Sequence, residues 1–236
     1  MFSDDSVATV INLNFEPVWV SVRPVPLVTI DFGNGKVVRR TLHGNVATYA
    51  CNSDGYVLDI LPGIYEPKTY LHRLRQLKLL HEMVAAEENR GDLSGLNIYH
   101  RRQVESLSEH QFHQELSKVR MASITGAEMP ARIIMNPPKR MASRAAYASG
   151  ERTPTAISAS ELPHWEALAK DTEQNETIRR LAIHDYLKDR NPLRPDEIKK
   201  WVYREVLHAD LDDPYLGLGK LLFDTYPFAE EDVASN

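Results

Sequence analysis

Two histidines three residues apart are the clearest candidate metal ligands in the sequence. His110 and His113 stand at i and i+3 of a predicted helix in segment 98–120, so both imidazoles can reach one ion. His100 lies ten residues before His110, not far from the face of His113. A catalytic zinc site also needs a third ligand and an open position. The spacing requires neither, so a solvated polar face is the competing interpretation.

A second candidate group recurs every four residues nearer the C-terminus. Glu176, Arg180 and His184 occupy positions i, i+4 and i+8 of a predicted helix, which places them along one continuous face. This face could form an acid–base or anion-binding cluster, because a guanidinium binds carboxylates and phosphates well. A salt-bridged seam between helices is the alternative, and it is the interpretation that we favour.

Cys51 is the single cysteine, and therefore the only thiol that could act as a nucleophile. It falls at the end of a predicted strand, with no histidine adjacent in sequence and no predicted helix N-terminus to lower its pKa. Cysteine is among the most buried residue types, so we expect a structural side chain here. A lone cysteine also excludes an intramolecular disulfide.

The first quarter of the chain is typical of strands and turns. The run Val18–Val22 is β-branched and aromatic, which predicts a strand. Segments Leu27–Phe32 and Lys36–Leu42 flank Gly-Asn-Gly, and segments Val46–Cys51 and Tyr56–Leu61 flank a turn that contains Asp-Gly. Both pairs are therefore predicted to be antiparallel hairpins.

Helical periodicity dominates the rest of the sequence. Apolar residues at three- and four-residue spacing predict a helix from Glu66 to about Glu88. Further helices are predicted over about 163–170, 175–188 and 195–208. Segment 126–163 is rich in proline, alanine and serine, which predicts an irregular connector.

Composition and charge narrow the classes of partner. The 236 residues carry 28 Lys and Arg against 33 Asp and Glu, a net charge of −5, which gives no reason to expect nucleic acid as the partner. No apolar stretch approaches the ~20 residues that span a bilayer, so no membrane association is expected. With one cysteine and no visible signal peptide, a cytoplasmic location is predicted. A signal peptide upstream of Met1 would change that expectation.

The first ninety residues contain patterns that resemble the thioredoxin-like family. Phe2–Ala8 followed by Ile11–Val20 is similar to the "F-S-D-x-x-V" turn and the "N-x-x-F-V-P-V-x-V" strand that come after the active-site helix of that family. Gly44–Leu58 resembles the family's "G-x-P-T-F-x-x-x-D-x-D-G-x-x-L" hairpin, and the helix around Tyr70 resembles its closing helix. The resemblance covers a little over a third of the chain. It implies a partial thioredoxin-like sheet with flanking helices.

Two departures from the family pattern bear on function. The Cys-x-x-Cys of the family would lie before Phe2, where this chain begins. The family's cis-proline position is taken by Val46, with Ala47 in place of the usual threonine. A cis bond before a non-proline residue costs about 3 kcal/mol, so the bond before Val46 is expected to be trans. The resemblance thus implies a degenerate domain rather than an active oxidoreductase.

The resulting prediction is an α+β chain: a thioredoxin-like domain at 1–91, a helical and Pro-rich connector at 92–162, and a small helical domain at 163–236. The leading hypothesis for function is a non-catalytic binding or scaffolding protein without a cofactor. Its partner would be another protein or a second copy that covers the sheet edge. The alternative is a thiol–disulfide oxidoreductase whose Cys-x-x-Cys lies upstream of Met1.

Overall fold

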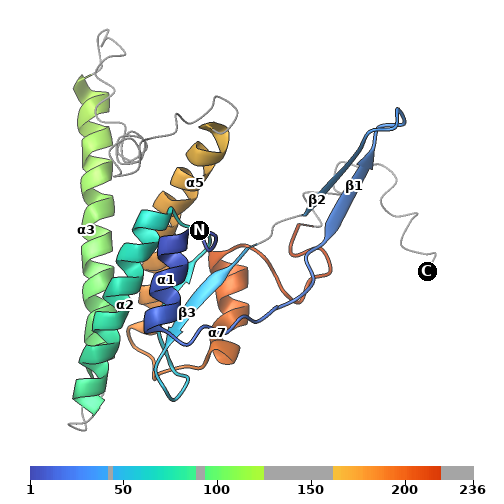
Figure 1. The fold of residues 1–236 in the computed structure, drawn as a ribbon. Coiled ribbons are helices and arrows are strands. Elements are labelled where there is room, and N and C mark those ends of the chain that lie inside the picture. Colours follow the sequence, from blue (N-terminus) through green and yellow to red (C-terminus); the bar gives the residue numbers. More distant parts are fainter. Residues whose placement is uncertain (42–44, 89–93, 125–161, 219–236) are drawn as a thin grey trace.

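The computed structural model describes residues 1–41, 45–88, 94–124 and 162–218, and its mixed α+β fold with a helical C-terminal part confirms the predicted fold class (Figure 1). Helices surround one short two-stranded sheet, while a second two-stranded sheet projects away from them. Within the described part of the chain, no helix combines the length and the apolar character that crossing a membrane requires.

Helix α1 (Asp5–Asn14) opens the fold and packs against helix α2 (Pro67–Glu88). Asp4 caps α1, because its carboxylate accepts hydrogen bonds from the backbone N–H groups of Ser6 and Val7 at 3.0 and 3.2 Å. The side chain of Val7 is fully buried in the core that α1 shares with α2. The capped helix therefore fixes where the segment after it begins.

Residues 15–26 run from α1 in an extended course without strand pairing. The sequence predicts a strand at Val18–Val22, and this prediction is wrong. The residue types favour a strand, but a strand needs a neighbour to satisfy its backbone groups, and none pairs with this segment among the described residues. Arg23 anchors the far end of the segment by donating hydrogen bonds to three carbonyl oxygens, those of Leu211, Asp213 and Pro214.

Strands β1 (Leu27–Asp31) and β2 (Val37–Thr41) form the first predicted hairpin. They pair antiparallel, with Leu27 opposite Thr41 and Asp31 opposite Val37. Gly33 at the turn has a φ of 69°, a value that glycine adopts without steric penalty. In Figure 1 the hairpin stands away from the helices, and it joins no other strand of the described chain.

Strands β3 (Ala47–Cys51) and β4 (Val57–Pro62) form the second predicted hairpin, with a register shift between Ala50 and Cys51. Every residue of β4 is buried, whereas β3 is half-buried and ends on an exposed residue. No described peptide bond is cis, so the bond before Val46 is trans, as expected. Strand β4 is thus buried along its whole length inside the fold.

The remaining helices are α3 (Ser94–Ile124), α5 (Leu162–Gln174), α6 (Arg180–Leu187) and α7 (Pro195–Trp201). The sequence predicts a break between two helices near residue 171. The structure corrects this, because a π-helical turn, Asn175–Arg179, joins α5 to α6 in one continuous helix. A second π-helical turn, Val202–Val206, extends α7.

Two hydrophobic clusters meet at β4. Leu58 and Leu61 pack into the cluster of α1 and α2, whereas Val57 and Ile60 pack into the cluster of α6 and α7. The first and last of the three predicted domains therefore share a hydrophobic core across their boundary. That division of the chain stays a prediction, and the predicted connector 126–163 lies almost wholly outside the described residues.

Candidate functional site

Five polar side chains from three elements meet inside the protein, and we call this group the buried polar network. Strand β4 contributes Asp59, α3 contributes Tyr99 and His100, and α6 contributes Arg180 and His184. Asp59, His100, Arg180 and His184 are each no more than 1 % exposed. Charged residues are almost never buried so deeply unless they are paired, so their contacts decide what the network can do.

Arg180 and Asp59 form an ion pair at the centre of the network. One N–H of Arg180 Nη2 donates to Asp59 Oδ2 at 3.0 Å. The hydroxyl of Tyr99 donates to the same oxygen at 2.8 Å, and the backbone N–H of Ile60 donates to Oδ1 at 2.7 Å. The carboxylate therefore has three hydrogen-bond donors, which compensates for much of its lost hydration.

The guanidinium also dictates the tautomers of both histidines. Arg180 Nη2 lies 2.9 Å from His184 Nε2, and because arginine can only donate, this Nε2 must be the unprotonated nitrogen. The proton of His184 then sits on Nδ1, from which it points to His100 Nδ1 at 2.8 Å. His100 consequently carries its own proton on Nε2.

The electrostatics of the network agree with this assignment. Burial lowers the pKa of His100 to about 4 and that of His184 to about 3, so both rings are neutral at neutral pH. Burial alone would raise the pKa of the Asp59 carboxyl, but Arg180, the two histidines and the Tyr99 hydrogen bond together lower the pKa well below its usual range. A charged Arg180–Asp59 pair with two neutral imidazoles results.

Three buried polar groups of Arg180 and its neighbour Tyr65 make no hydrogen bond within the described part of the chain. Arg180 Nε, Arg180 Nη1 and the hydroxyl of Tyr65 are buried and have no hydrogen-bond partner among the described residues. Burial raises the pKa of the Tyr65 hydroxyl, so this group is a neutral phenol beside the guanidinium. Unpaired buried donors cost free energy, so these groups reduce the stability that the network gains from its hydrogen bonds.

Glu176, the third member of the predicted Glu–Arg–His face, lies at the rim of the network. Its carboxylate pairs with Arg73 of α2, whose Nε lies 2.9 and 3.0 Å from the two carboxylate oxygens. The structure therefore brings Arg180 and His184 into contact but gives Glu176 a different partner. All three side chains connect their helix to a neighbouring element, which is the arrangement of a seam.

Chemistry on a substrate would require access, and the network has almost none. The reactive atoms of Asp59, His100 and His184 are enclosed by α2, α3, α6 and β4. In this conformation the network can hold three elements in register, but it cannot contact a solute. Its arrangement is that of a polar core.

His100 and His110, two of the histidines that the sequence offers as metal ligands, do not lie together in the structure. His100 points inward to His184, whereas His110 is exposed about 15 Å further along α3, at 1.5 Å per residue. The side chain of His113 lies outside the described residues. Across the described part of the chain, no three His, Cys, Asp or Glu side chains gather in a way that could hold a metal ion.

Cys51 departs from the expectation of a buried side chain. It is an exposed residue at the end of β3, next to the register shift between Ala50 and Cys51. Partial desolvation raises the pKa of the thiol above its usual value, so the thiol is protonated at neutral pH. Exposure without a lowered pKa is not the environment of a catalytic thiolate.

Val46 and Ala47, at the position of the family's cis-proline, lead into β3. The carbonyl oxygen of Val46 accepts a hydrogen bond from the backbone N–H of Gly63 at 2.6 Å, which closes the β3–β4 pair. Ala47 is half-buried against the cluster of α6 and α7. Both residues are therefore engaged within the fold and present no open docking edge of their own.

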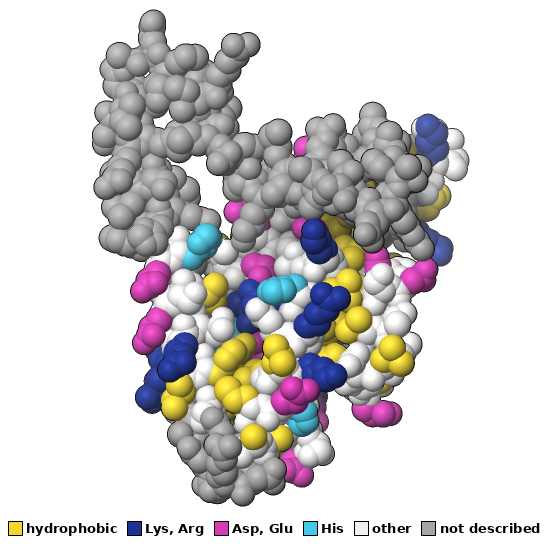
Figure 2. Space-filling model, turned by 60° about the vertical axis from the view of Figure 1, so that its left-hand side comes forward, with side chains coloured by type: hydrophobic (Ala, Val, Ile, Leu, Met, Phe, Trp, Pro, Cys, Tyr) yellow, Lys and Arg dark blue, Asp and Glu magenta, His cyan; other side chains and the backbone are white. Residues whose placement is uncertain are grey.

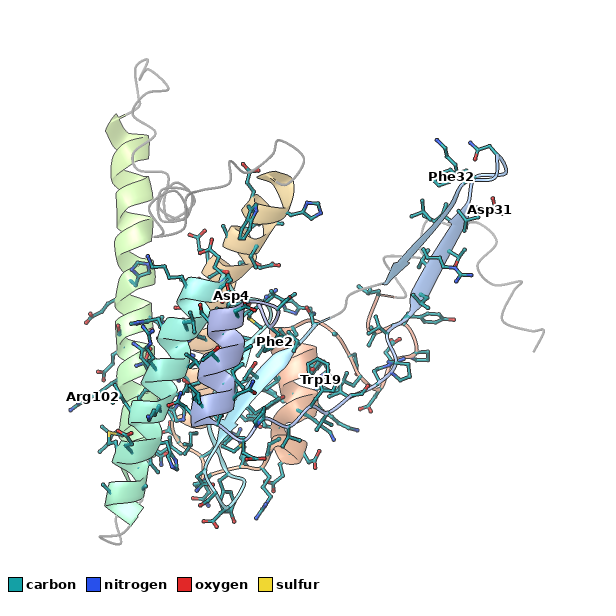
Figure 3. The ribbon with its side chains drawn as sticks, in the orientation of Figure 1. Phe2, Asp4, Trp19, Asp31, Phe32 and Arg102 are labelled. Atoms are coloured by element: carbon teal, nitrogen blue, oxygen red, sulfur yellow. The ribbon has the colours of Figure 1, made fainter. Side chains whose placement is uncertain are left out.

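Most of the strongly exposed large apolar side chains of the described residues lie in residues 15–41, which we call the arm. Six of its apolar side chains are more than half exposed: Val18 80 %, Trp19 79 %, Val20 69 %, Leu27 68 %, Phe32 59 % and Val37 53 %. Figure 3 places Trp19 at the base of the arm and Phe32 at its tip. The face in Figure 2 shows hydrophobic side chains among positive and negative ones over the described residues.

No family model matches the chain, and neither a curated protein nor a solved structure does. The residues above must therefore carry the functional argument.

Sequence reasoning missed Asp59 and Tyr99. Asp59 stands alone within the apolar run Val-Leu-Asp-Ile-Leu, and a single acid in a buried strand is a signal that a paired charge lies nearby. Tyr99 carries no such signal beyond its position next to His100.

Proposed function

We propose that this protein is a non-catalytic binding module that engages a protein partner through its arm. The observation that carries the proposal is the exposure of Val18, Trp19 and Val20, which lie consecutively in an extended and unpaired segment. Exposed apolar side chains that gather in one segment mark interaction sites more often than singly scattered ones do.

The geometry of the arm supports a role in binding. Trp19 is held at its base by an edge-to-face contact with Phe2, whose ring centroid lies 6.5 Å away, and Phe2 in turn contacts Tyr70 at 5.8 Å. Arg23 fixes the other end of the segment to the C-terminal turn. An apolar surface that is pre-positioned at both ends loses less entropy when a partner binds.

The thioredoxin-like ancestry of the first ninety residues belongs to this proposal. It would account for the order of β3, β4 and α2, whereas the trans bond before Val46 is a departure from that family. The closed polar network and the unactivated thiol of Cys51 favour binding over catalysis. The exposed apolar residues of the arm belong neither to the polar network nor to the surroundings of Cys51.

Photocrosslinking tests the proposal directly. The photoreactive amino acid p-benzoylphenylalanine is placed at Trp19 in the full chain, in its native cells, and the protein is irradiated. Arg102 is the matched control, because Figure 3 places this exposed residue on the opposite side of the molecule from Trp19. We expect a discrete protein adduct at position 19 that is absent at position 102.

The specificity of that adduct is checked with Val18→Ser and Val20→Ser. Both substitutions keep the backbone and remove the flanking apolar side chains, so the adduct should disappear. The proposal is wrong if position 19 gives no protein adduct, or if positions 19 and 102 give the same adducts.

A further inference from the structure

The two strands of the arm's hairpin have different outer edges, and neither edge pairs with another strand of the described residues. Phe32 N–H donates to Lys36 C=O at 3.1 Å, so residues 32 and 36 form a hydrogen-bonded pair. Such pairs alternate along an antiparallel ladder, and the register continues unbroken to Leu27 opposite Thr41. The backbone groups of Leu27, Thr29 and Asp31 therefore point outward, away from β2.

The outer edge of β1 is complementary to itself. When a second β1 is placed antiparallel about a two-fold axis at Thr29, Thr29 faces its own copy and Leu27 faces Asp31. Val28 then faces Ile30 across the axis. No like charges meet, and opposed threonines and opposed β-branched residues are favourable cross-strand pairs.

The outer edge of β2 fails the same test. Its outward backbone groups belong to residues 37, 39 and 41, so a symmetric pair would be centred on Arg39. This pairing would set one exposed guanidinium directly against its copy, and like charges in that position are destabilising. Basic side chains on an edge strand are a common protection against such pairing.

Building on the proposed function of the arm, we propose that the arm's partner is a second copy of this chain, bound by antiparallel β1–β1 pairing centred on Thr29. The product is a four-stranded sheet in the order β2–β1–β1–β2. The charge pattern on the two edges selects this occupant and this register.

The pairing also explains how an isolated hairpin keeps its structure. Two strands alone are marginally stable in water, whereas three or more strands with a hydrophobic face are stable. Val28, Ile30 and Val38 lie on one face of the hairpin, because Ile30 is opposite Val38 and side chains alternate along each strand. Pairing through β1 would place the apolar faces of the two hairpins on the same side of one four-stranded sheet.

The mass of the full chain in solution gives the first measurement. Light scattering after size exclusion, over a range of concentrations, should report a species of twice the chain mass of 26.9 kDa. Thr29→Glu should shift this species to monomer at all concentrations, because two carboxylates would meet at the axis. Within one hairpin the new carboxylate faces Arg39, so the arm itself is not weakened by the substitution.

A cysteine pair gives the register. In a Cys51→Ser background, Thr29→Cys should form an intersubunit disulfide under mild oxidation, because opposed residues in a hydrogen-bonded pair have a Cα separation of about 5.5 Å. Arg39→Cys in the same background is the matched control and should remain monomeric on denaturing gels. Equal crosslinking at both positions would contradict the β1 register.

The outcomes separate this proposal from the one on which it rests. A strict monomer that still forms an adduct with a different protein at Trp19 overturns self-pairing and leaves the binding function intact. A strict monomer without any adduct at Trp19 overturns both. A dimer that Thr29→Glu does not dissociate overturns the β1 interface.

Discussion

The buried polar network and the arm depart from the usual distribution of side chains in opposite directions. In the network, Asp59, Arg180 and two histidines are enclosed within the fold, whereas in the arm Val18, Trp19 and Phe32 face water. Each departure has a cost, because burying charge and exposing apolar surface are both unfavourable. The network offsets part of its cost internally, with hydrogen bonds between its own members, while Arg180 Nε and Nη1 lack a partner among the described residues. Under the proposal above, a second molecule compensates for the exposed apolar side chains of the arm.

This difference separates stability from binding within one small protein. Substitutions in the network should lower the free energy of unfolding and leave the arm's surface unchanged. Substitutions in the arm should change association and leave unfolding almost unchanged.

The largest effect is expected for Asp59→Ala. Removing the carboxylate leaves Arg180 charged, buried and unpaired, and breaking a buried pair in this way costs about 3–5 kcal/mol. Urea unfolding followed by circular dichroism measures the loss. Asp189→Ala is the matched control: its partner Arg101 is 60 % exposed, and exposed pairs contribute about 0.2–1 kcal/mol. Similar losses in both variants would contradict the comparison.

The pH dependence of unfolding comes next in size. His100 and His184 have folded pKa values of about 4 and about 3, while an unfolded histidine titrates near pH 6.5. The unfolded state therefore binds more protons between these values, and stability falls as the pH drops below about 6.5. Each histidine contributes at most about 1.4 kcal/mol per pH unit in that window.

Urea titrations at pH 7, 6 and 5 measure this slope. His184→Gln should reduce it, because one of the two titrating groups is removed. The arm contains no histidine, so Trp19→Ser should leave the slope unchanged. A slope that is the same in all three proteins would show that the network does not titrate on unfolding.

A glycine comparison gives a smaller effect. Gly63 has a φ of 77°, and a Cβ there would lie 2.8 Å from the side-chain amide atoms of Asn175. Gly35 in the arm has a φ of 81° with nothing within 4 Å of such a Cβ. Gly63→Ala should cost about 2–3 kcal/mol because strain and overpacking add. Gly35→Ala should cost about 1–2 kcal/mol, because alanine is strained at a positive φ. This loss should be confined to the hairpin. Thermal unfolding followed in the near-ultraviolet region distinguishes the two.

The smallest effect on stability is expected for the combined substitution of Val18, Trp19 and Val20 by serine. These side chains are 69–80 % exposed, so the free energy of unfolding should change by no more than about 0.5 kcal/mol. The protein adduct of this segment should nevertheless be lost, as measured with a photoreactive group at Val22, a partly exposed residue of the same segment. A loss of several kcal/mol would mean that this segment belongs to the core.

Local patterns in the sequence were sufficient to predict both hairpins, α2 and the start of α7. Turn residues and apolar periodicity act over a few positions, and Gly-Asn-Gly between β-branched runs is such a signal. The strand predicted at Val18–Val22 failed because pairing depends on a neighbour that local sequence does not encode.

The candidate site was only half predictable for the same reason. Arg180 and His184 share a helix face, and four-residue spacing was enough to place them together. Their partners Asp59 and His100 lie 121 and 84 residues away in sequence, and no local pattern connects them. Cys51 shows the limit of residue type: cysteine suggested burial, but this residue is exposed at the end of β3.

The π-helical turn at Asn175–Arg179 has a consequence for how this chain can tolerate a change in length. Each residue of an α-helix advances the face by about 100°, so deleting one residue from the turn would restore α-helical spacing and rotate α5 relative to α6. Thr172 of α5, which accepts a hydrogen bond from the backbone N–H of Glu66 at 2.8 Å, would then leave the loop after β4. The turn acts as a one-residue insertion. It fixes the rotation of the face of α5 relative to the face of α6. A homologue that lacks it should carry its contact to that loop at a different position of α5.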